Sequence, residues 1–247
     1  MTPSLADKLF GFHEYTCCCC GVDVFDDSGF CDVCKAALPL NNGKTCALCG
    51  AKIEGDHDYC ANCKPSDRYF EKIVSSFDYT DVAVTLMRSF KYGNARYLAG
   101  VFAKYMATTF LESGLEVDIV VPAPLSARSL EKRGYNQSLL LAREFCLLTG
   151  LPLEEDNLIK IKETVQQEKL TNIQRRNNLS DAFDVVDKTA FVGKKVLVID
   201  DVKTTGTTID RIAKLLKKCK AAKVYGLTAV SARERLKVNR DKENKDE

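Results

Sequence analysis

The chain has 247 residues, of which 45% are hydrophobic, and a formal net charge of +2. This length and apolar content suit one large domain, or one domain plus a small module, with a packed core. The near-neutral charge excludes a uniformly basic nucleic-acid-binding protein, so any nucleic-acid site must be a local basic patch.

The start of the chain predicts a cytoplasmic protein. Residues Met1 to Lys8 lack a basic segment followed by an apolar run, as a secretory signal requires. No stretch approaches the ~18 apolar residues that suggest a membrane span. Twelve cysteines in a cytoplasmic protein indicate metal binding rather than disulfides. Cys146 and Cys219 stand alone in predicted helices, where we expect structural thiols.

Composition divides the chain into three regions. Residues 1–65 are rich in cysteine and turn residues and predict a zinc-binding module. Residues 66–232 alternate apolar and amphipathic segments and predict the main domain. Residues 233–247 are almost all charged or polar and predict a mobile tail.

The first region contains an internal repeat. Two C-x-x-C pairs separated by ten residues recur 29 residues later, and Gly21 and Gly50 follow the same cysteine in each copy. Two such pairs bring four thiolates together on tight turns, which suits tetrahedral zinc. The predicted ligands are Cys17, Cys20, Cys31 and Cys34 in the first copy and Cys46, Cys49, Cys60 and Cys63 in the second.

The eight thiolates predict one or two structural zinc ions rather than a redox or iron–sulfur centre. The repeat favours two sequential sites over an interleaved pair, although Cys18 or Cys19 offers a competing ligand in the first copy. His57 is expected to be exposed rather than a ligand. With seven acids and four bases from Tyr15 to Pro65, the module favours a scaffold or protein-docking role over a nucleic-acid finger.

Residues 66–232 predict strands that alternate with helices, and hence an α/β domain with a parallel sheet. The strand Val196–Ile199 is continuously apolar, as expected of a strand covered on both faces. The other predicted strands are 73–79, 117–121 and 224–228, and the predicted helices are 82–90, 97–111, 136–148 and 208–218.

A candidate ligand site follows the strand Val196–Ile199. Asp200 and Asp201 come at its carboxyl end, where α/β sheets bind ligands. A loop at 202–207 and a helix from about Thr208 come next. Hydroxyls, a glycine and the free N–H groups of a helix start suit a phosphate, and two carboxylates suit ribose hydroxyls. The predicted loop residues are Val202, Lys203, Thr204, Thr205, Gly206, Thr207 and Thr208.

The alternative is a buried strand that ends in a polar turn and an N-capped helix, with threonines as caps. Two adjacent acids before Thr-Thr-Gly-Thr-Thr make that interpretation the less favoured one. The segment is not a P-loop, because it lacks the G-x-x-x-x-G-K-[ST] pattern.

The segment 196–208 resembles the PRPP-binding motif of type I phosphoribosyltransferases. Together with the cysteine-rich region, the chain resembles the ComF family of competence-associated phosphoribosyltransferase-like proteins from Cys17 to about Arg233. Three further segments resemble that family's signatures. They are Lys91-Tyr92, residues 121–137 with Pro124, Arg128, Arg133, Gly134, Tyr135, Asn136 and Gln137, and residues 164–183 with Thr164, Gln167, Leu170, Arg175, Asn178, Ala182 and Phe183.

The resemblance implies a type I phosphoribosyltransferase-like fold with roles for several residues. Asp200 and Asp201 would hold the ribose, and the loop after them the 5′-phosphate. The segment Pro122–Arg128 would bind pyrophosphate, with Arg133 nearby as a cation. Residues 164–176, with Arg175, would form a hood that closes over the site. Mg²⁺ would accompany PRPP, bound mostly through water.

Two functions of different classes follow. An enzyme would bind PRPP and displace pyrophosphate at the anomeric carbon, for an acceptor that no motif identifies. A non-catalytic module would bind single-stranded DNA during uptake and transformation, or dock a competence helicase. Basic residues interleaved with aromatics favour the DNA alternative, namely Arg88, Phe90, Lys91, Tyr92, Arg96 and Tyr97.

Overall fold

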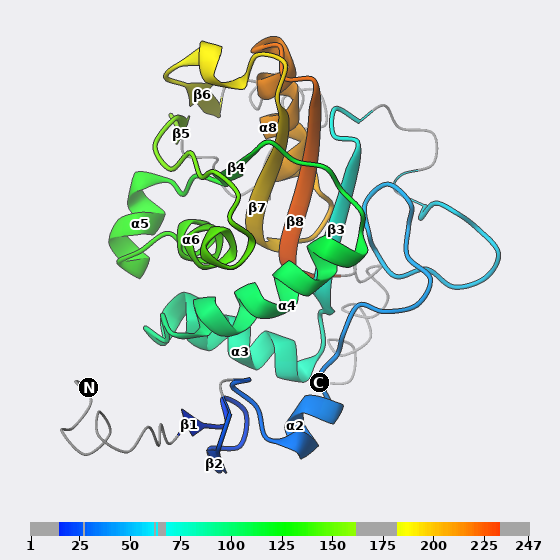
Figure 1. Ribbon diagram of the computed structural model, residues 1–247, viewed down its shortest axis with the longest axis vertical. Helices are drawn as coiled ribbons and strands as arrows, with labels where there is room; N and C mark the ends of the chain where they lie inside the picture. The colour runs from blue at the N-terminus through cyan, green and yellow to red at the C-terminus, as the bar shows by residue number, and fades with distance from the viewer. Residues whose placement is uncertain (1–14, 27, 62, 64–67, 162–181, 233–247) are drawn as a thin grey trace, which may run out of the picture.

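The computed structural model describes residues 15–26, 28–61, 63, 68–161 and 182–232. Its centre is a four-stranded parallel sheet in the order β3-β8-β7-β4 (Figure 1). The strands are β3 (Lys72–Asp78), β8 (Lys223–Ser231), β7 (Lys195–Lys203) and β4 (Ile119–Pro122). All four run the same way, so their carboxyl ends meet at one edge.

Helices cover both faces of this sheet. On one face, α4 (Leu98–Glu112) contacts β3 and β8, and α6 (Gln137–Thr149) contacts β7 and β4. The other face is covered by α8 (Thr207–Lys218), which contacts β7 and β8. The other helices of the described residues are α2 (Asp32–Ala36), α3 (Asp81–Tyr92), α5 (Ala127–Arg133) and the 3-10 turn η2 (Lys188–Phe191).

The core explains why β7 is apolar on both faces. Leu197 and Ile199 pack with the residues of α4 and α6, whereas Val196 and Val198 pack with those of α8. All four are fully buried. The predicted α/β fold with a parallel sheet is therefore confirmed.

Two short antiparallel pairs stand outside the sheet. One joins β1 (Tyr15–Thr16) to β2 (Asp23–Val24), and the other joins β5 (Leu158–Lys160) to β6 (Phe183–Val185). The strand β6 contacts α8. Among the helices of the described residues, none combines the length and the apolar character needed to cross a bilayer.

The elements differ from the prediction chiefly at β7. This strand continues to Lys203, so the loop before α8 is Thr204–Gly206 rather than 202–207, and α8 starts at Thr207. The extension follows from β8, because Val202 pairs with Val230 and Lys203 with Ser231. Backbone hydrogen bonds to a neighbouring strand thus extend β7 through polar residues.

The cysteine-rich region lies against the sheet instead of standing apart from it. Its β1, β2 and α2 lie below α3 and α4 in Figure 1, and the chain then runs beside β3. There the Asn41 N–H donates to Ser76 O (2.8 Å), the Asp78 N–H to Pro39 O (2.7 Å), and the Ile73 N–H to Leu48 O (2.8 Å). The outer edge of β3 is therefore covered by backbone from this region.

Candidate functional site

The acid pair lies at the carboxyl end of β7, between α3 and α6. Ser138, at the start of α6, donates from Oγ to Asp200 Oδ1 at 3.0 Å, and the Asp201 N–H donates to the same oxygen at 2.9 Å. Asp201 Oδ2 lies 3.0 Å from Lys91 Nζ, near the end of α3. Each carboxylate is thus held by a different helix.

The two carboxylates have different environments. Burial, followed by the neighbouring Asp201 charge, raises the pKa of Asp200 to about 7. Asp201 is also buried, but its oxygen is paired with the Lys91 ammonium. Near neutral pH Asp200 can therefore carry a proton, so its carboxyl group can donate to hydroxyl groups as well as accept from them.

The loop Thr204–Gly206 forms the turn into α8. Gly206 has φ +76°, and a Cβ on it would lie 3.2 Å from Ile73 Cδ1. Thr205 Oγ1 and Thr207 Oγ1 are hydrogen-bonded at 2.7 Å, whereas Thr204 and Thr208 are exposed. The first N–H groups of α8 have no partner within the helix, and they carry partial positive charge. An exposed hydroxyl loop at such a helix start suits a phosphate.

Lys203 is oriented differently from what its place in the motif suggests. Its side chain is buried, with 3% exposed, and Nζ lies 3.8 Å from Cys49 Sγ. The amine is therefore directed to the second group of cysteines. The Lys203 backbone remains part of the sheet, since Lys203 pairs with Ser231 and its carbonyl oxygen accepts from the Ala232 N–H at 2.7 Å.

The predicted pyrophosphate segment adjoins the acid pair. Pro122 ends β4 and pairs with Ile199, and the Ala123 N–H donates to Ile199 O at 2.8 Å. Pro124 is half-buried, and Arg128 is exposed on α5. Parallel pairing of β4 with β7 thus places the start of this segment beside the strand residue that precedes Asp200.

The segment Arg133–Gln137 connects these parts. The Arg133 guanidinium lies over the Tyr92 ring (5.4 Å to the centroid) and donates to Gln137 Oε1 at 3.0 Å. Tyr135 donates from its hydroxyl to Phe90 O. Asn136 Nδ2 donates to Ala123 O at 3.1 Å, while its Oδ1 accepts from the Ser138 N–H. The side chain of Asn136 therefore fixes the end of β4 to the start of α6.

Not every predicted residue lies at this site. Arg175 and the rest of the predicted hood, 164–176, lie outside the described residues, as does the predicted tail 233–247. The strands β5 and β6, which flank the hood in sequence, are paired. Ser138 was not predicted as a site residue. Its position directly after Asn136 and Gln137 was the available signal, but the contact with Asp200 spans 62 residues.

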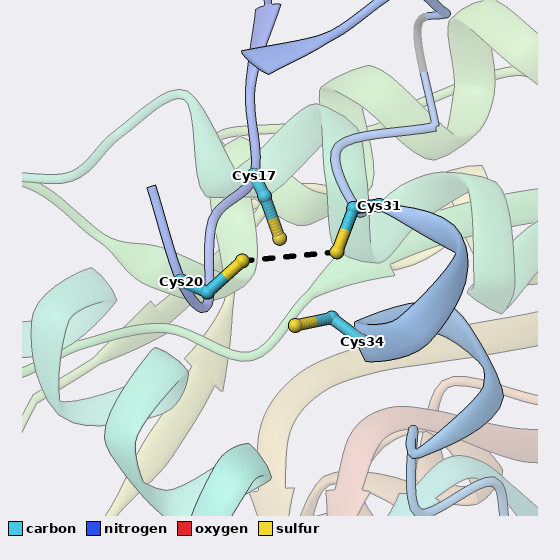
Figure 2. Close-up of side chains that lie close together, drawn as sticks. All are labelled: Cys17, Cys20, Cys31 and Cys34. Atoms are coloured by element: carbon cyan, nitrogen blue, oxygen red, sulfur yellow. Dashed lines mark hydrogen bonds between the residues drawn. The ribbon is translucent and has the colours of Figure 1, made fainter. Parts of the chain in front are cut away.

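The eight paired cysteines form two groups of four. Within each group the four Sγ atoms lie within 4.8 Å of one another. The first cluster is Cys17, Cys20, Cys31 and Cys34 (Figure 2), and the second is Cys46, Cys49, Cys60 and Cys63. The structure thus brings together the sequential sets of ligands, without Cys18 or Cys19.

The spacing of the sulfurs tests whether zinc would fit. A tetrahedron with Zn–S bonds of about 2.3 Å has S···S edges of about 3.8 Å. Cys20 Sγ and Cys31 Sγ lie 3.7 Å apart in the first cluster, where Figure 2 shows all four sulfurs facing a common centre. Cys49 Sγ and Cys60 Sγ lie 3.6 Å apart in the second. Both clusters can therefore hold a tetrahedral ion.

The first cysteine of each cluster has a thiol pKa below its ordinary value. Burial opposes the charged form of Cys17, but hydrogen bonds from the backbone N–H groups of Cys20, Cys31 and Cys19 outweigh it and lower the pKa to about 6. In the same way, the N–H groups of Cys49, Cys60 and Leu48 overcome burial and lower the pKa of Cys46 to about 7. The two turns repeat one thiolate-binding geometry, as their repeated sequence predicts.

The chain is similar in sequence to several known proteins. The family model for the phosphoribosyl transferase domain matches residues 130–245. The chain is 30% identical over 166 residues to competence protein F of Haemophilus influenzae, covering 64% of this chain and 72% of that protein. It is also 30% identical over 160 residues to the DNA utilization protein YhgH of Salmonella typhimurium, covering 63% and 70%.

A solved structure, the glutamine PRPP amidotransferase of B. subtilis in complex with ADP and GMP, matches 57% of this chain and 30% of its own with a TM-score of 0.41 and 21% identity. The family match confirms a phosphoribosyltransferase-like domain in the second half of the chain.

Proposed function

The chain belongs to the ComF family of competence proteins, and from this premise we propose that it binds PRPP or ribose 5-phosphate with Mg²⁺ and acts in DNA uptake and natural transformation. The observation that supports the ligand is the pair Asp200 and Asp201, held by Ser138 and Lys91 directly before the hydroxyl loop of α8. Carboxylates next to a phosphate-binding helix start match the two ends of a ribose 5-phosphate.

In this proposal the chain's own residues divide the ligand between them. Asp200 and Asp201 accept hydrogen bonds from the ribose hydroxyls. The loop Thr204–Gly206, together with Thr207, Thr208 and the first N–H groups of α8, binds the 5′-phosphate. The segment Pro122–Arg128 and Arg133 bind the pyrophosphate, together with Arg175 of the hood that the family resemblance implies. Mg²⁺, when bound with PRPP, would neutralise phosphate charge, and the acid pair is chemically suited to hold its water ligands.

Titration calorimetry tests the ligand. PRPP with Mg²⁺ should release heat on binding to the wild-type protein. The double variant Asp200→Asn/Asp201→Asn should bind PRPP at least tenfold more weakly, which is a loss of about 1.4 kcal/mol or more in binding free energy. The matched control is Asp187→Asn, which changes an exposed aspartate whose Oδ1 caps η2. Equal binding by wild type and the double variant would contradict the proposal.

Turnover is a separate question from binding. If the protein is an enzyme, it is a phosphoribosyltransferase that releases pyrophosphate from PRPP in the presence of its acceptor. Pyrophosphate release, measured with a panel of nucleobases and amines, distinguishes an enzyme from a binding protein. Absence of release together with tight PRPP binding would favour the non-catalytic alternative.

A second candidate function, single-stranded DNA binding, is favoured by the aromatic and basic residues near Lys91. Tyr92 and Tyr97 are exposed, Arg133 lies over the Tyr92 ring, and Arg96 lies 4.7 Å from the Tyr135 centroid. Phe90 is fully buried and leaves this set. DNA binding that falls steeply with salt, and falls further in Tyr92→Ala, would support this function.

Two further parts of the proposal concern the cysteines. We propose one structural zinc ion in each cluster, which would suit a reducing compartment such as the cytoplasm. We also propose that the cysteine-rich region is the docking surface for a competence helicase. Copurification of such a helicase with the full chain, but not with a chain carrying Phe25→Ala and Val33→Ala, would support that role, because both side chains are exposed on this region.

A further inference from the structure

The second cysteine cluster touches the end of β7 at Lys203. This lysine directly precedes the loop Thr204–Gly206, and its side chain is 3% exposed. A buried ammonium needs a partner that compensates for lost water. Lys203 Nζ lies 3.8 Å from Cys49 Sγ, in a cluster that brings four cysteine sulfurs together. A tetrahedral zinc with four thiolates carries a net charge of about −2, so the lysine and the loaded cluster stabilise each other.

Ile73 of β3 makes a second connection between the second cysteine cluster and the loop Thr204–Gly206. On one side, a Cβ on Gly50 would lie 2.5 Å from Ile73 O, and the Ile73 N–H donates to Leu48 O. On the other side, Ile73 Cδ1 lies 3.2 Å from where a Cβ on Gly206 would be. One residue is thus packed closely against the cysteine turn and against the loop. A shift of the turn would displace the support of the loop.

The first cluster has a different environment. Its neighbours are on α4, where a Cβ on Gly29 would lie 2.8 Å from Val101 Cγ2 and the Phe30 ring lies edge-on to Tyr105. These contacts bind the first cluster to the helix layer. The two copies of the repeat therefore occupy different places, although their sequences and thiol geometries match.

From these contacts we infer that the second cysteine cluster positions the phosphate loop through Lys203, so that metal in the cluster and phosphate ligand in the loop strengthen each other's binding. The inference rests on the proposed function of the loop. Lys203 is a positioning residue in it, because its charge meets sulfur rather than ligand. Coupling between two binding sites is reciprocal. If zinc in the cluster raises the affinity of the loop for its ligand, the bound ligand must raise the affinity of the cluster for zinc by the same factor.

The test compares three zinc-loaded full-length proteins: wild type, Lys203→Met and Lys195→Met. Lys195 is the matched control, because it begins the same strand and pairs with Glu116 at the opposite end. A chromogenic chelator withdraws zinc with and without PRPP and Mg²⁺. The release phase of the second cluster is the one that disappears in Cys63→Ser, which alters a ligand other than Cys49.

PRPP should slow that phase by about fivefold or more in wild type and Lys195→Met. In Lys203→Met the slowing should fall below about twofold, and PRPP should bind more weakly than to Lys195→Met. Any direct removal of zinc by PRPP would act equally on all three proteins. Lys203→Arg keeps the positive charge and should therefore keep the slowing by PRPP. If Lys203→Met does not fold, Lys203→Gln takes its place as the uncharged variant in the comparison with Lys203→Arg.

The outcomes separate the inference from the function on which it rests. If wild-type protein gives no heat with PRPP, the proposed function fails and the coupling with it. If wild type binds PRPP but Lys203→Met and Lys203→Gln keep the full slowing, the coupling alone is overturned. If the slowing is lost in the uncharged variants and kept in Lys203→Arg and Lys195→Met, the coupling is supported.

Discussion

Asp201 and Lys91 form an ion pair with 3.0 Å between Oδ2 and Nζ, and their side chains are only 12% and 18% exposed. The pair connects the sheet's ligand edge to the end of α3. Lys91 is followed by Tyr92, whose ring carries the Arg133 guanidinium. One residue of the acid pair is thereby linked to the cationic and aromatic side of the site.

This pair should be costly to break from one side. Lys91→Met leaves a buried carboxylate without its cation and should lower the free energy of unfolding by about 2 kcal/mol. The double variant Lys91→Met/Asp201→Asn should recover about half of that loss, because the uncompensated charge is gone. Urea unfolding of the wild type and the three variants measures the cycle. Additive losses in the double variant would show that the two groups do not interact.

The raised pKa of Asp200 predicts a pH dependence of stability. An acid with a folded-state pKa of about 7 keeps its proton on folding, whereas the unfolded chain loses it near pH 4. Between these values the folded state binds more protons than the unfolded state, so this group's contribution to stability falls as pH rises from about 4 to 7.

The variant Asp200→Asn isolates that contribution. Its melting temperature relative to wild type should increase as pH is raised from about 5 to 8, because the amide does not ionise. Taking the difference between the two proteins at each pH removes effects that they share, such as zinc loss in acid. A difference that stays constant over this range would contradict the raised pKa.

Packing of the cysteine-rich region on α4 predicts that Phe30 contributes to the stability of the whole protein. Phe30 is 2% exposed and lies edge-on to Tyr105 at 6.1 Å between centroids. Phe30→Ala should cost about 3 kcal/mol. Phe25→Ala is the matched control in the same region, and with Phe25 90% exposed it should cost under about 0.5 kcal/mol. Calorimetric melting of both variants provides the measurement.

The number of metal ions follows from the two clusters. Protein purified under reducing conditions without chelator should contain two zinc ions per chain by elemental analysis, one for each set of four thiols. Cys63→Ser should reduce this to about one and lower the melting temperature, because metal binding contributes to folding. A content well below one ion in the wild type would refute the zinc proposal.

Sequence reasoning went furthest where a local pattern determines the structure. The 29-residue repeat predicted both groups of four cysteines, and the apolar run Val196–Ile199 predicted a strand buried on both faces. The division into 1–65, 66–232 and 233–247 stays a prediction. The shared core of Cys17, Phe30 and Phe77 shows close packing between the first two regions.

The remainder depends on contacts between distant residues. The helix α5 was not predicted, since none of its residues is buried and it has no apolar face to recognise. The direction of Lys203 depends on Cys49, which lies 154 positions away in sequence, and the partner of Asp200 depends on α6. A sequence motif identifies the residues of a ligand-binding loop, but contacts with the rest of the fold determine where each of their side chains points.

The strand order β3-β8-β7-β4 also determines when the sheet can assemble during synthesis. Both outer strands precede both central strands in the chain, so a ribosome makes β3 and β4 before either has a partner within the sheet. Native pairing has to wait until residues 195–231 have been translated. By then residues 39–48 have long been available to β3, so its outer side is shielded early while its inner side waits for β8.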